Sequence, residues 1–294
     1  MLDWLAVVLL GVIEGVTEFL PVSSTGHLLL AQRWLPAQTD LFNIVIQCGA
    51  VLAVLPLFRK RIASMLSLSP GGQAYAARVI VAFGITAVGG LALDKFGIGL
   101  PDDVLPIAIA LVVGGIAFLV AERVVDIRAA GVRNASLSGG EASPSAPHQT
   151  HHGDKQQSGL FCEAQSTLAW SVVVAVGAGQ LLAAVFPGTS RSGATIVIML
   201  LLGVSRVAAT EFTFLVGIPT ILAAGGYKIF KALRADGVSG EDWSMVILGS
   251  VVAAVVSFVV VKWLLVYVQT HSFRAFGIYR IVVGLIFFAV LALG

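Results

Sequence analysis

The chain has 294 residues, of which 57% are hydrophobic and 12% charged, and its mean hydropathy is +0.95. A water-soluble protein of this length needs a charged surface, so the composition excludes a soluble domain and is typical of a chain that faces lipid. The net charge of +2 is nearly balanced, so we expect no nucleic-acid partner. The apolar runs are continuous and do not alternate as barrel strands do, which predicts an all-α polytopic membrane protein.

Six apolar stretches are long enough to cross a hydrocarbon layer about 30 Å thick, which takes about 20 helical residues. They cover residues 41–58, 74–93, 104–122, 210–230, 243–266 and 275–293. Two further apolar regions, residues 5–32 and 170–204, are interrupted by prolines and charged residues. We predict that each forms a re-entrant, broken pair of short helices, so that the fold has six transmembrane helices plus two such pairs.

A polar segment separates the chain into halves. Within residues 134–158, Ser, Gly, Pro and His replace large apolar side chains, and such a segment cannot bury enough surface to offset the entropy of ordering. We therefore predict a flexible linker at residues 127–162 between a first membrane repeat, residues 1–126, and a second, residues 163–294. Three linker histidines favour a solvated loop over a metal site, because no framework surrounds them: His148, His151 and His152.

Basic residues follow the first and third spans, at positions 59–61 and between positions 123 and 133. Cytoplasmic loops are enriched in Lys and Arg, so we place both clusters in the cytoplasm. With three spans per half, and re-entrant pairs that enter and leave on one side, the halves have opposite orientations and form an inverted repeat. Three basic residues then lie outside, against the rule: Lys228, Lys231 and Arg234.

The two interrupted regions resemble each other when aligned on their prolines. Pro21 and Pro187 are each followed three positions later by a serine, Ser24 and Ser190. On the same alignment Glu14 corresponds to Gln180. Weakly repeated, interrupted hydrophobic segments indicate a midplane site in inverted-repeat membrane proteins, so we expect the two segments to meet.

The first polar segment covers residues 14–27 and reads EGVTEFLPVSSTGH. Its spacing places Glu14 and Glu18 on one helical face, one turn apart. Pro21 breaks the helix, and one of three hydroxyl residues caps the helix that follows: Ser23, Ser24 or Thr25. We expect Gly26 to let the backbone approach a ligand and His27, one turn beyond the serines, to take part in chemistry.

The second polar segment covers residues 187–195 and reads PGTSRSGAT. A helix start favours anions, and the guanidinium of Arg191 suits phosphate, so we predict a phosphate-binding loop. Its small and hydroxyl residues would line that loop: Gly188, Ser190, Ser192 and Gly193. Glu211 is a candidate partner for Arg191 or for Arg206.

These two segments resemble the signature motifs of the undecaprenyl-diphosphate phosphatase family, the bacterial phosphatases whose overproduction gives bacitracin resistance. The resemblance extends to Gly203-Val-Ser-Arg206 and Glu211-Phe212 and covers nearly the whole chain. Only the linker departs from it, being longer and richer in histidine than the family leads us to expect.

The resemblance implies hydrolysis of undecaprenyl diphosphate to undecaprenyl phosphate and inorganic phosphate, which recycles the lipid carrier for peptidoglycan synthesis. It also implies a location in the bacterial inner membrane, with the site facing the periplasm, and it is compatible with a homodimer. On this basis we assign Ser24 as nucleophile, Glu18 as the group that takes or orients its proton, His27 as acid or base, and Arg191 as the phosphate clamp.

A divalent cation, Mg²⁺ or Ca²⁺, is a further implication of the resemblance. Hard cations prefer oxygen ligands, which makes Glu14 and Glu18 the candidate metal ligands. Roles for Glu18 as ligand and as base compete, and the sequence does not choose between them. The rival function is a polyprenyl-phosphate flippase or another inverted-repeat transporter, since midplane charges and broken helices suit both.

Overall fold

The computed structural model describes residues 3–67, 69–96, 104–138, 168–234 and 242–293. Within these residues it contains helices and no strands, and six helices are long and apolar enough to cross a membrane. They span Asp40–Leu66, Pro70–Lys95, Val104–Gly131, Arg206–Arg234, Trp243–Thr270 and Arg274–Ala292. The predicted multi-pass helical membrane protein is confirmed, with all six spans where the apolar stretches place them.

Both interrupted regions are broken helices. The first comprises α1 (Asp3–Thr17) and α2 (Ser24–Ala31), and the second comprises α8 (Trp170–Val185) and α9 (Arg191–Leu201). Pro21 and Pro187 lie in the short connections, where a missing N–H and a fixed φ prevent helix continuation. The breaks are confirmed, while the re-entrant path of each pair through the membrane stays a prediction.

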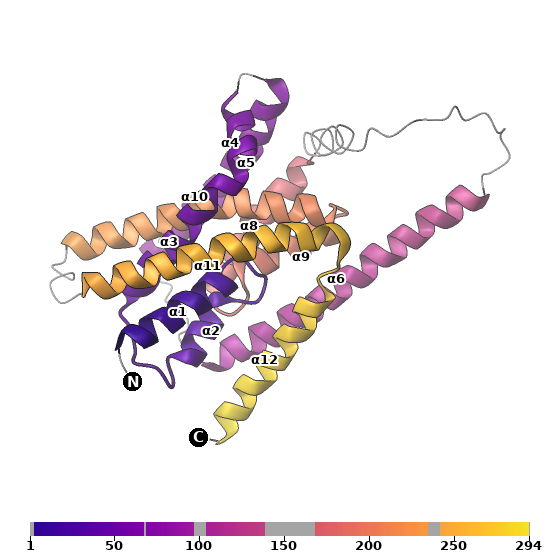
Figure 1. Cartoon of the computed structure of the whole chain (residues 1–294). Coiled ribbons are helices and arrows are strands. Elements are labelled where there is room, and N and C mark those ends of the chain that lie inside the picture. The colour runs from indigo at the N-terminus through magenta and orange to yellow at the C-terminus, as the bar shows by residue number, and fades with distance from the viewer. Residues whose placement is uncertain (1–2, 68, 97–103, 139–167, 235–241, 294) are drawn as a thin grey trace.

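The remaining helices form the bundle around these two pairs (Figure 1). In the first half they are α3 (Asp40–Val54), the 3₁₀ turn η1 (Leu55–Phe58), α4 (Arg59–Leu66), α5 (Pro70–Lys95) and α6 (Val104–Ser138). In the second half they are α10 (Arg206–Arg234), α11 (Trp243–Thr270) and α12 (Arg274–Leu293). Because α3, η1 and α4 follow one another without a gap, they make one continuous span.

Helix α6 is longer than the sequence predicts and projects beyond the rest of the bundle (Figure 1). It continues to Ser138, so residues 127–138 of the expected linker are helical. The polar composition of this part does not prevent helix formation, because an apolar helix already nucleated before it can simply be extended. The rest of the linker, including His148, His151 and His152, lies outside the described residues.

The two halves interlock rather than packing as separate units. Helix α1 packs on α11 of the other half, and its counterpart α8 packs on α5. In the same reciprocal way α3 packs on α11 and α10 packs on α5, while α6 pairs with α12. This exchange pattern is the one that two related halves would give, and it brings both broken pairs to the middle of the bundle. The inversion between the halves stays a prediction.

Close contact between α1 and α11 depends on small residues. A Cβ added to Gly11 would lie 2.8 Å from the carbonyl oxygen of Gly249, and one added to Gly15 would lie 2.7 Å from that of Ala253. The hydroxyl of Ser257 donates to the Gly15 carbonyl at 3.0 Å. Small residues allow membrane helices to approach closely, and this contact fixes α1 just before its break.

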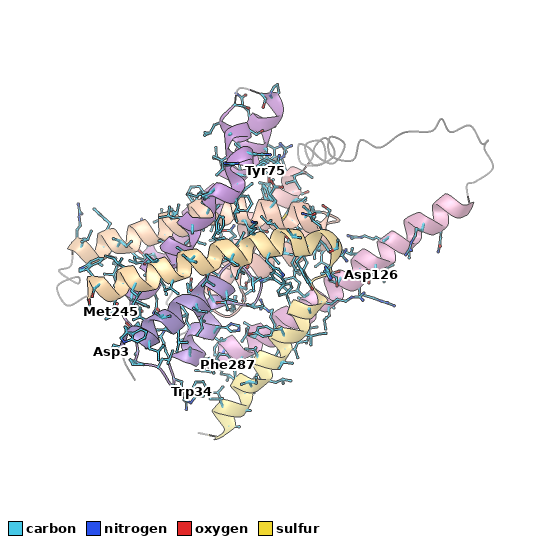
Figure 2. All side chains as sticks on the ribbon, viewed as in Figure 1. Asp3, Trp34, Tyr75, Asp126, Met245 and Phe287 are labelled. Atoms are coloured by element: carbon cyan, nitrogen blue, oxygen red, sulfur yellow. The ribbon has the colours of Figure 1, made fainter. Side chains whose placement is uncertain are left out.

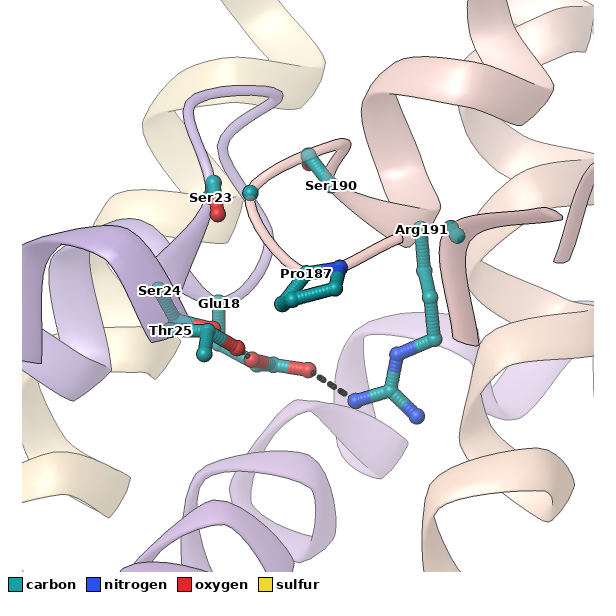
Figure 3. Close-up of a pocket in the computed structure, with 9 residues that line it drawn as sticks. Glu18, Ser23, Ser24, Thr25, Pro187, Ser190 and Arg191 are labelled. Atoms are coloured by element: carbon teal, nitrogen blue, oxygen red, sulfur yellow. Dashed lines mark hydrogen bonds and ion pairs between the residues drawn. The ribbon is translucent and has the colours of Figure 1, made fainter. Parts of the chain in front are cut away.

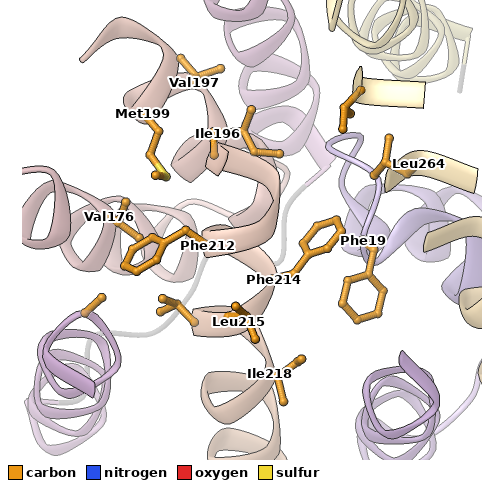
Figure 4. Close-up of a cluster of buried hydrophobic side chains, with 14 of the residues drawn as sticks. Phe19, Val176, Ile196, Val197, Met199, Phe212, Phe214, Leu215, Ile218 and Leu264 are labelled. Atoms are coloured by element: carbon orange, nitrogen blue, oxygen red, sulfur yellow. The ribbon is translucent and has the colours of Figure 1, made fainter. Parts of the chain in front are cut away.

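The main hydrophobic core surrounds the second broken pair and the loop after α1 (Figure 4). Phe19, in that loop, packs edge-to-face on Phe214 of α10 at a centroid distance of 5.2 Å. Phe58 contacts the same Phe214 ring at 6.2 Å. Aromatic contacts of this kind are worth about 0.5–1.5 kcal/mol beyond area burial, so they hold the loop against α10.

Ion pairs join the halves at the end of the bundle where α11 turns into α12. Glu122 of α6 is fully buried. Its carboxylate forms an ion pair with Arg206 at 2.5 Å and accepts a hydrogen bond from the backbone N–H of Phe273 at 2.8 Å. Asp126, one turn further along α6 and beside that turn (Figure 2), pairs with Arg274.

Glu211 pairs with neither of the two arginines that the sequence offered as its partner, Arg191 and Arg206. Glu211 binds Arg61 of α4 at 2.6 Å, whereas Arg191 binds Glu18 and Arg206 binds Glu122. The error arises because Arg61 is far away in sequence and adjacent only once α4 and α10 are folded. The ring of Tyr75 also lies 5.4 Å from the Arg61 guanidinium.

Replacing Glu122 by Ala is expected to destabilise the protein by about 3–5 kcal/mol, because it leaves Arg206 without its buried partner and the Phe273 N–H without an acceptor. The measurement is unfolding of purified protein in mixed micelles as the denaturing detergent fraction rises. Asp126→Ala is the matched control, since Asp126 and its near partner Arg274 are both about half-exposed and its contact with Arg206 is long, at 3.9 Å. It is expected to cost less than about 1 kcal/mol. Equal effects of the two substitutions would contradict this account.

Candidate active site

Ser23 and Ser190 are the caps of the two short helices that follow the breaks. Each accepts a hydrogen bond from the N–H three residues on, Gly26 at 3.4 Å and Gly193 at 3.1 Å. Their φ angles are 76° and 68°, and they are the only non-glycine residues with positive φ in the part of the chain that the structure describes. Such backbone strain costs about 1–3 kcal/mol and concentrates at functional sites. Of the three residues that could cap α2, Ser23 does so.

The shared cap geometry corrects the expected alignment. Ser190 corresponds to Ser23 in position and conformation, so Arg191 corresponds to Ser24. Proline alignment misses this by one residue, because the cap lies two positions after Pro21 in the first segment and three positions after Pro187 in the second. The first residues of α2 and α9 are therefore a hydroxyl and a cation.

The two breaks meet in one pocket between α2 and α9 (Figure 3). Seven of the predicted site residues line it together: Glu18, Ser23, Ser24, Thr25, Gly188, Ser190 and Arg191. Ala183 and Pro187 complete the lining. The expectation that the two segments form one site is consistent with this geometry, and helices α2 and α9 both begin at the pocket.

Glu18 is the centre of the polar contacts. Its Oε2 accepts the Ser24 hydroxyl at 2.5 Å and the Gln47 amide at 3.1 Å. Its Oε1 binds the Arg191 guanidinium at 2.9 Å, as Figure 3 shows. Only 4% of the Glu18 side chain is exposed, so these contacts operate away from bulk water and are stronger than at a surface. One carboxylate thus connects the hydroxyl of one segment to the cation of the other.

His27 lies beside the pocket and does not contact Ser24. Its Nδ1 is 2.7 Å from the Ser23 carbonyl oxygen, which can only accept, so Nδ1 carries the proton. Nε2 then accepts from the Tyr279 hydroxyl at 2.8 Å. The two rings stack at 5.6 Å. In this arrangement His27 supports the strained cap of α2, and its role as acid or base stays a prediction.

The other predicted residues lie behind the pocket wall. Glu14 is fully buried, and neither of its carboxyl oxygens has a hydrogen-bond partner among the described residues. Ser192 donates to the Leu20 carbonyl at 3.3 Å and so ties α9 to the first segment. Gly26 and Gly193 contribute the N–H groups bound by the caps.

Three residues that contact the site were not predicted: Gln47, Tyr279 and Arg280. Gln47 and Arg280 are polar groups inside apolar spans, which is the signal that could have identified them. Tyr279 has no such signal, because tyrosine is common in membrane helices and its contact with His27 depends on how α12 packs.

The chain matches the family model for bacitracin resistance protein BacA over residues 7–286. It is 43% identical to the undecaprenyl-diphosphatase of Rhizobium etli (strain CIAT 652), with 97% of this chain and 96% of the relative aligned. It is 42% identical to the undecaprenyl-diphosphatase of Xanthomonas oryzae pv. oryzae (strain PXO99A), with the same coverage, and 43% identical to that of Xylella fastidiosa (strain 9a5c), with 97% and 98% aligned. The chain therefore belongs to the bacitracin resistance protein BacA family.

Proposed function

We propose that this protein hydrolyses undecaprenyl diphosphate to undecaprenyl phosphate and inorganic phosphate within the membrane. The single observation that carries the chemistry is the Ser24 hydroxyl bound to Glu18 Oε2 at 2.5 Å, opposite Arg191. A hydroxyl paired with a carboxylate is an activated nucleophile, and the cation beside it suits a phosphate. Relatives at 42–43% identity carry the same activity in their name.

The reaction proceeds by two displacements at the terminal phosphorus. The Ser24 oxygen forms a bond to phosphorus while its proton passes to Glu18, and the bridging P–O bond breaks, with its electron pair leaving on undecaprenyl phosphate. Glu18 gives the proton it holds to the departing undecaprenyl phosphate. Water then attacks the phosphoserine and gives one proton to Glu18, which passes it to the Ser24 oxygen as the phosphoserine P–O bond breaks and inorganic phosphate leaves. In the net reaction one water molecule hydrolyses one diphosphate bond, and Ser24 and Glu18 return to their starting states.

Charge on the transferring phosphoryl group is offset by Arg191 and by the starts of α2 and α9. Phosphoryl transfer depends mostly on positioning and charge stabilisation. The N–H groups at a helix start favour anions, and here two such starts face one pocket. The Arg191 side chain is 27% exposed and lines that pocket, so it can exchange part of its contact with Glu18 for a phosphate oxygen.

A divalent cation fits the acidic pair. Glu14 offers two buried oxygens without partners, and Mg²⁺ is commonly held by one or two carboxylates together with substrate phosphates. Glu14 and Glu18 would hold it, and when bound it would neutralise diphosphate charge. Because both oxygens of Glu18 already have partners, Glu14 is the better ligand and Glu18 the better base.

The rival function, a polyprenyl-phosphate flippase, needs an anion site and alternating access but no Ser24–Glu18 contact. Purified protein in detergent, where no gradient exists, is expected to release phosphate from farnesyl diphosphate, a short soluble analogue of the substrate. Absence of phosphate release, together with transfer of a labelled polyprenyl phosphate between leaflets in vesicles, would reject the phosphatase and support the flippase.

Arg191→Lys is expected to lower kcat by about 10²-fold, because an ammonium keeps the charge but cannot bind Glu18 and a phosphate oxygen in the same plane. The measurement is phosphate release under saturating substrate. Arg128→Lys is the control, since Arg128 is exposed and donates only to the carbonyls of Leu200 and Leu201 at the far end of α9. Full activity of Arg191→Lys would contradict a phosphate-binding role for the guanidinium and would mean that Arg191 only holds α9 in place.

We further propose that the protein lies in the bacterial inner membrane with the pocket open to the periplasm. The basic residues after the first and third spans support this orientation. Labelling of a cysteine placed at exposed Thr25 by an impermeant reagent in intact spheroplasts tests it. A homodimer also stays a prediction.

A further inference from the structure

Arg280 is a fully buried arginine in the first half of α12. Its guanidinium has no carboxylate partner among the described residues and instead donates to four backbone carbonyls at 3.1–3.5 Å: those of Pro21, Ala110, Leu111 and Gly188. A buried cation at membrane depth costs about 2.5–3.5 kcal/mol on insertion scales, so its presence in an apolar helix calls for a role.

The four acceptors belong to three different parts of the molecule. Pro21 lies in the connection before α2, and Gly188 lies in the connection before α9. Ala110 and Leu111 lie on α6, against which α12 packs. One guanidinium thus ties the two connections to each other and to a transmembrane helix. Its planar, multi-donor shape suits this task in a way that a single ammonium does not.

Glycines on both sides make room for this guanidinium. A Cβ added to Gly193 of α9 would lie 2.8 Å from Nη1 of Arg280, and one added to Gly114 of α6 would overlap Nη2. No carbon side chain fits between the guanidinium and these two backbones. The arginine is therefore held in one place by the same helices whose connections it binds.

Arg280 does not line the pocket, so it acts on the reaction only through the backbone that it holds. Each connection that it binds ends at a strained cap, Ser23 or Ser190, and the next residue is Ser24 or Arg191. A strained conformation persists only when surrounding contacts fix it. Loss of the shared tether would let both caps relax and would change the separation of Ser24 from Arg191.

We propose that Arg280 is a positioning residue that sets the distance between the Ser24 segment and the Arg191 segment. The proposal rests on the proposed phosphatase function. Because a displacement of about 1 Å at a reacting group can cost about 10²-fold in rate, the effect falls on kcat. The KM changes little, since Arg280 does not itself line the pocket and reaches it only through the backbone carbonyl of Gly188.

Arg280→Lys and Arg280→Met test the proposal as a graded pair. We expect kcat per folded protein to fall about 10-fold for Lys and about 10²-fold for Met, with KM within about threefold of wild type. Folded protein is quantified by size exclusion and thermal unfolding. Arg78→Lys is the control, because Arg78 also donates to two carbonyls, those of Ala74 and Leu168, but to neither connection. Wild-type kcat in folded Arg280→Lys and Arg280→Met would overturn the proposal.

Gly114→Ala displaces the Arg280 guanidinium without removing it. This variant tests the positioning role of Arg280 if the arginine variants do not fold. We expect it to fold and to lose kcat about 10-fold or more, whereas Gly131→Ala, on the same helix with open space around it, keeps wild-type kcat. A wild-type kcat in Gly114→Ala would overturn the proposal. If the wild-type protein releases no phosphate, the proposed function fails, and this proposal fails with it.

Discussion

Ser24→Ala is expected to lose phosphate release by about 10³-fold or more while remaining folded, because it removes the oxygen that forms the new bond to phosphorus. Ser24 is not a cap: the capping oxygen of α2 belongs to Ser23, so alanine leaves the helix start intact. It also leaves Glu18 bound to Gln47 and Arg191. The measurement is a single-turnover time course with saturating enzyme.

Ser257→Ala is the control for this substitution. Ser257 is also a buried serine and donates to the Gly15 carbonyl, away from the pocket. Ser257→Ala is expected to lower the free energy of unfolding by about 1 kcal/mol and to leave the rate of phosphate release unchanged. If Ser24→Ala kept activity near that of Ser257→Ala, the nucleophile would have to be another group.

Glu18→Gln is expected to lower kcat by about 10²–10⁴-fold, because the amide keeps the shape of the carboxylate but cannot take the proton of Ser24. It also leaves Arg191 without its counter-charge in a poorly solvated place. Glu18→Asp retains a base at a longer distance and is expected to lose less. The measurement is steady-state phosphate release for both variants.

A matched control for Glu18→Gln is Glu211→Gln. Glu211 also pairs with an arginine, Arg61 of α4, but does not line the pocket, and its neutralisation is expected to change stability rather than kcat. Equal kcat for wild type and Glu18→Gln would show that the carboxylate only orients Arg191. Equal losses in the Asp and Gln variants would indicate that size, and not basicity, matters at this position.

Much of the fold follows from residue chemistry alone. Runs of about 20 apolar residues have one stable form in lipid, so the six spans were predictable, and prolines mark both breaks. The C-terminal end of α6 was not predictable, because the polar residues up to Ser138 continue a helix that the apolar residues before them have already formed. The partners of Arg206 and Glu211 were also not predictable, since Glu122 and Arg61 come close only after distant helices pack.

The placement of the candidate site residues was predictable where local chemistry decides it and was not predictable where packing decides it. The meeting of Glu18, Ser24 and Arg191 in one pocket follows from misplaced polarity in apolar segments. The cap positions follow from φ angles that no spacing rule gives, so the alignment of Ser24 with Ser190 was one residue out. Arg280 carried a visible signal, a cation within an apolar span, but its carbonyl acceptors depend on tertiary structure.

The central claim is that Ser24, and not water, makes the first new bond to the terminal phosphorus. The stereochemical course at that phosphorus tests it most directly, with a prenyl thiodiphosphate made chiral at the terminal position by oxygen isotopes and hydrolysed in isotopically labelled water. Two successive in-line displacements, first by Ser24 and then by water, predict retention of configuration in the released thiophosphate. Inversion would mean a single direct attack by water and would contradict the assignment of Ser24.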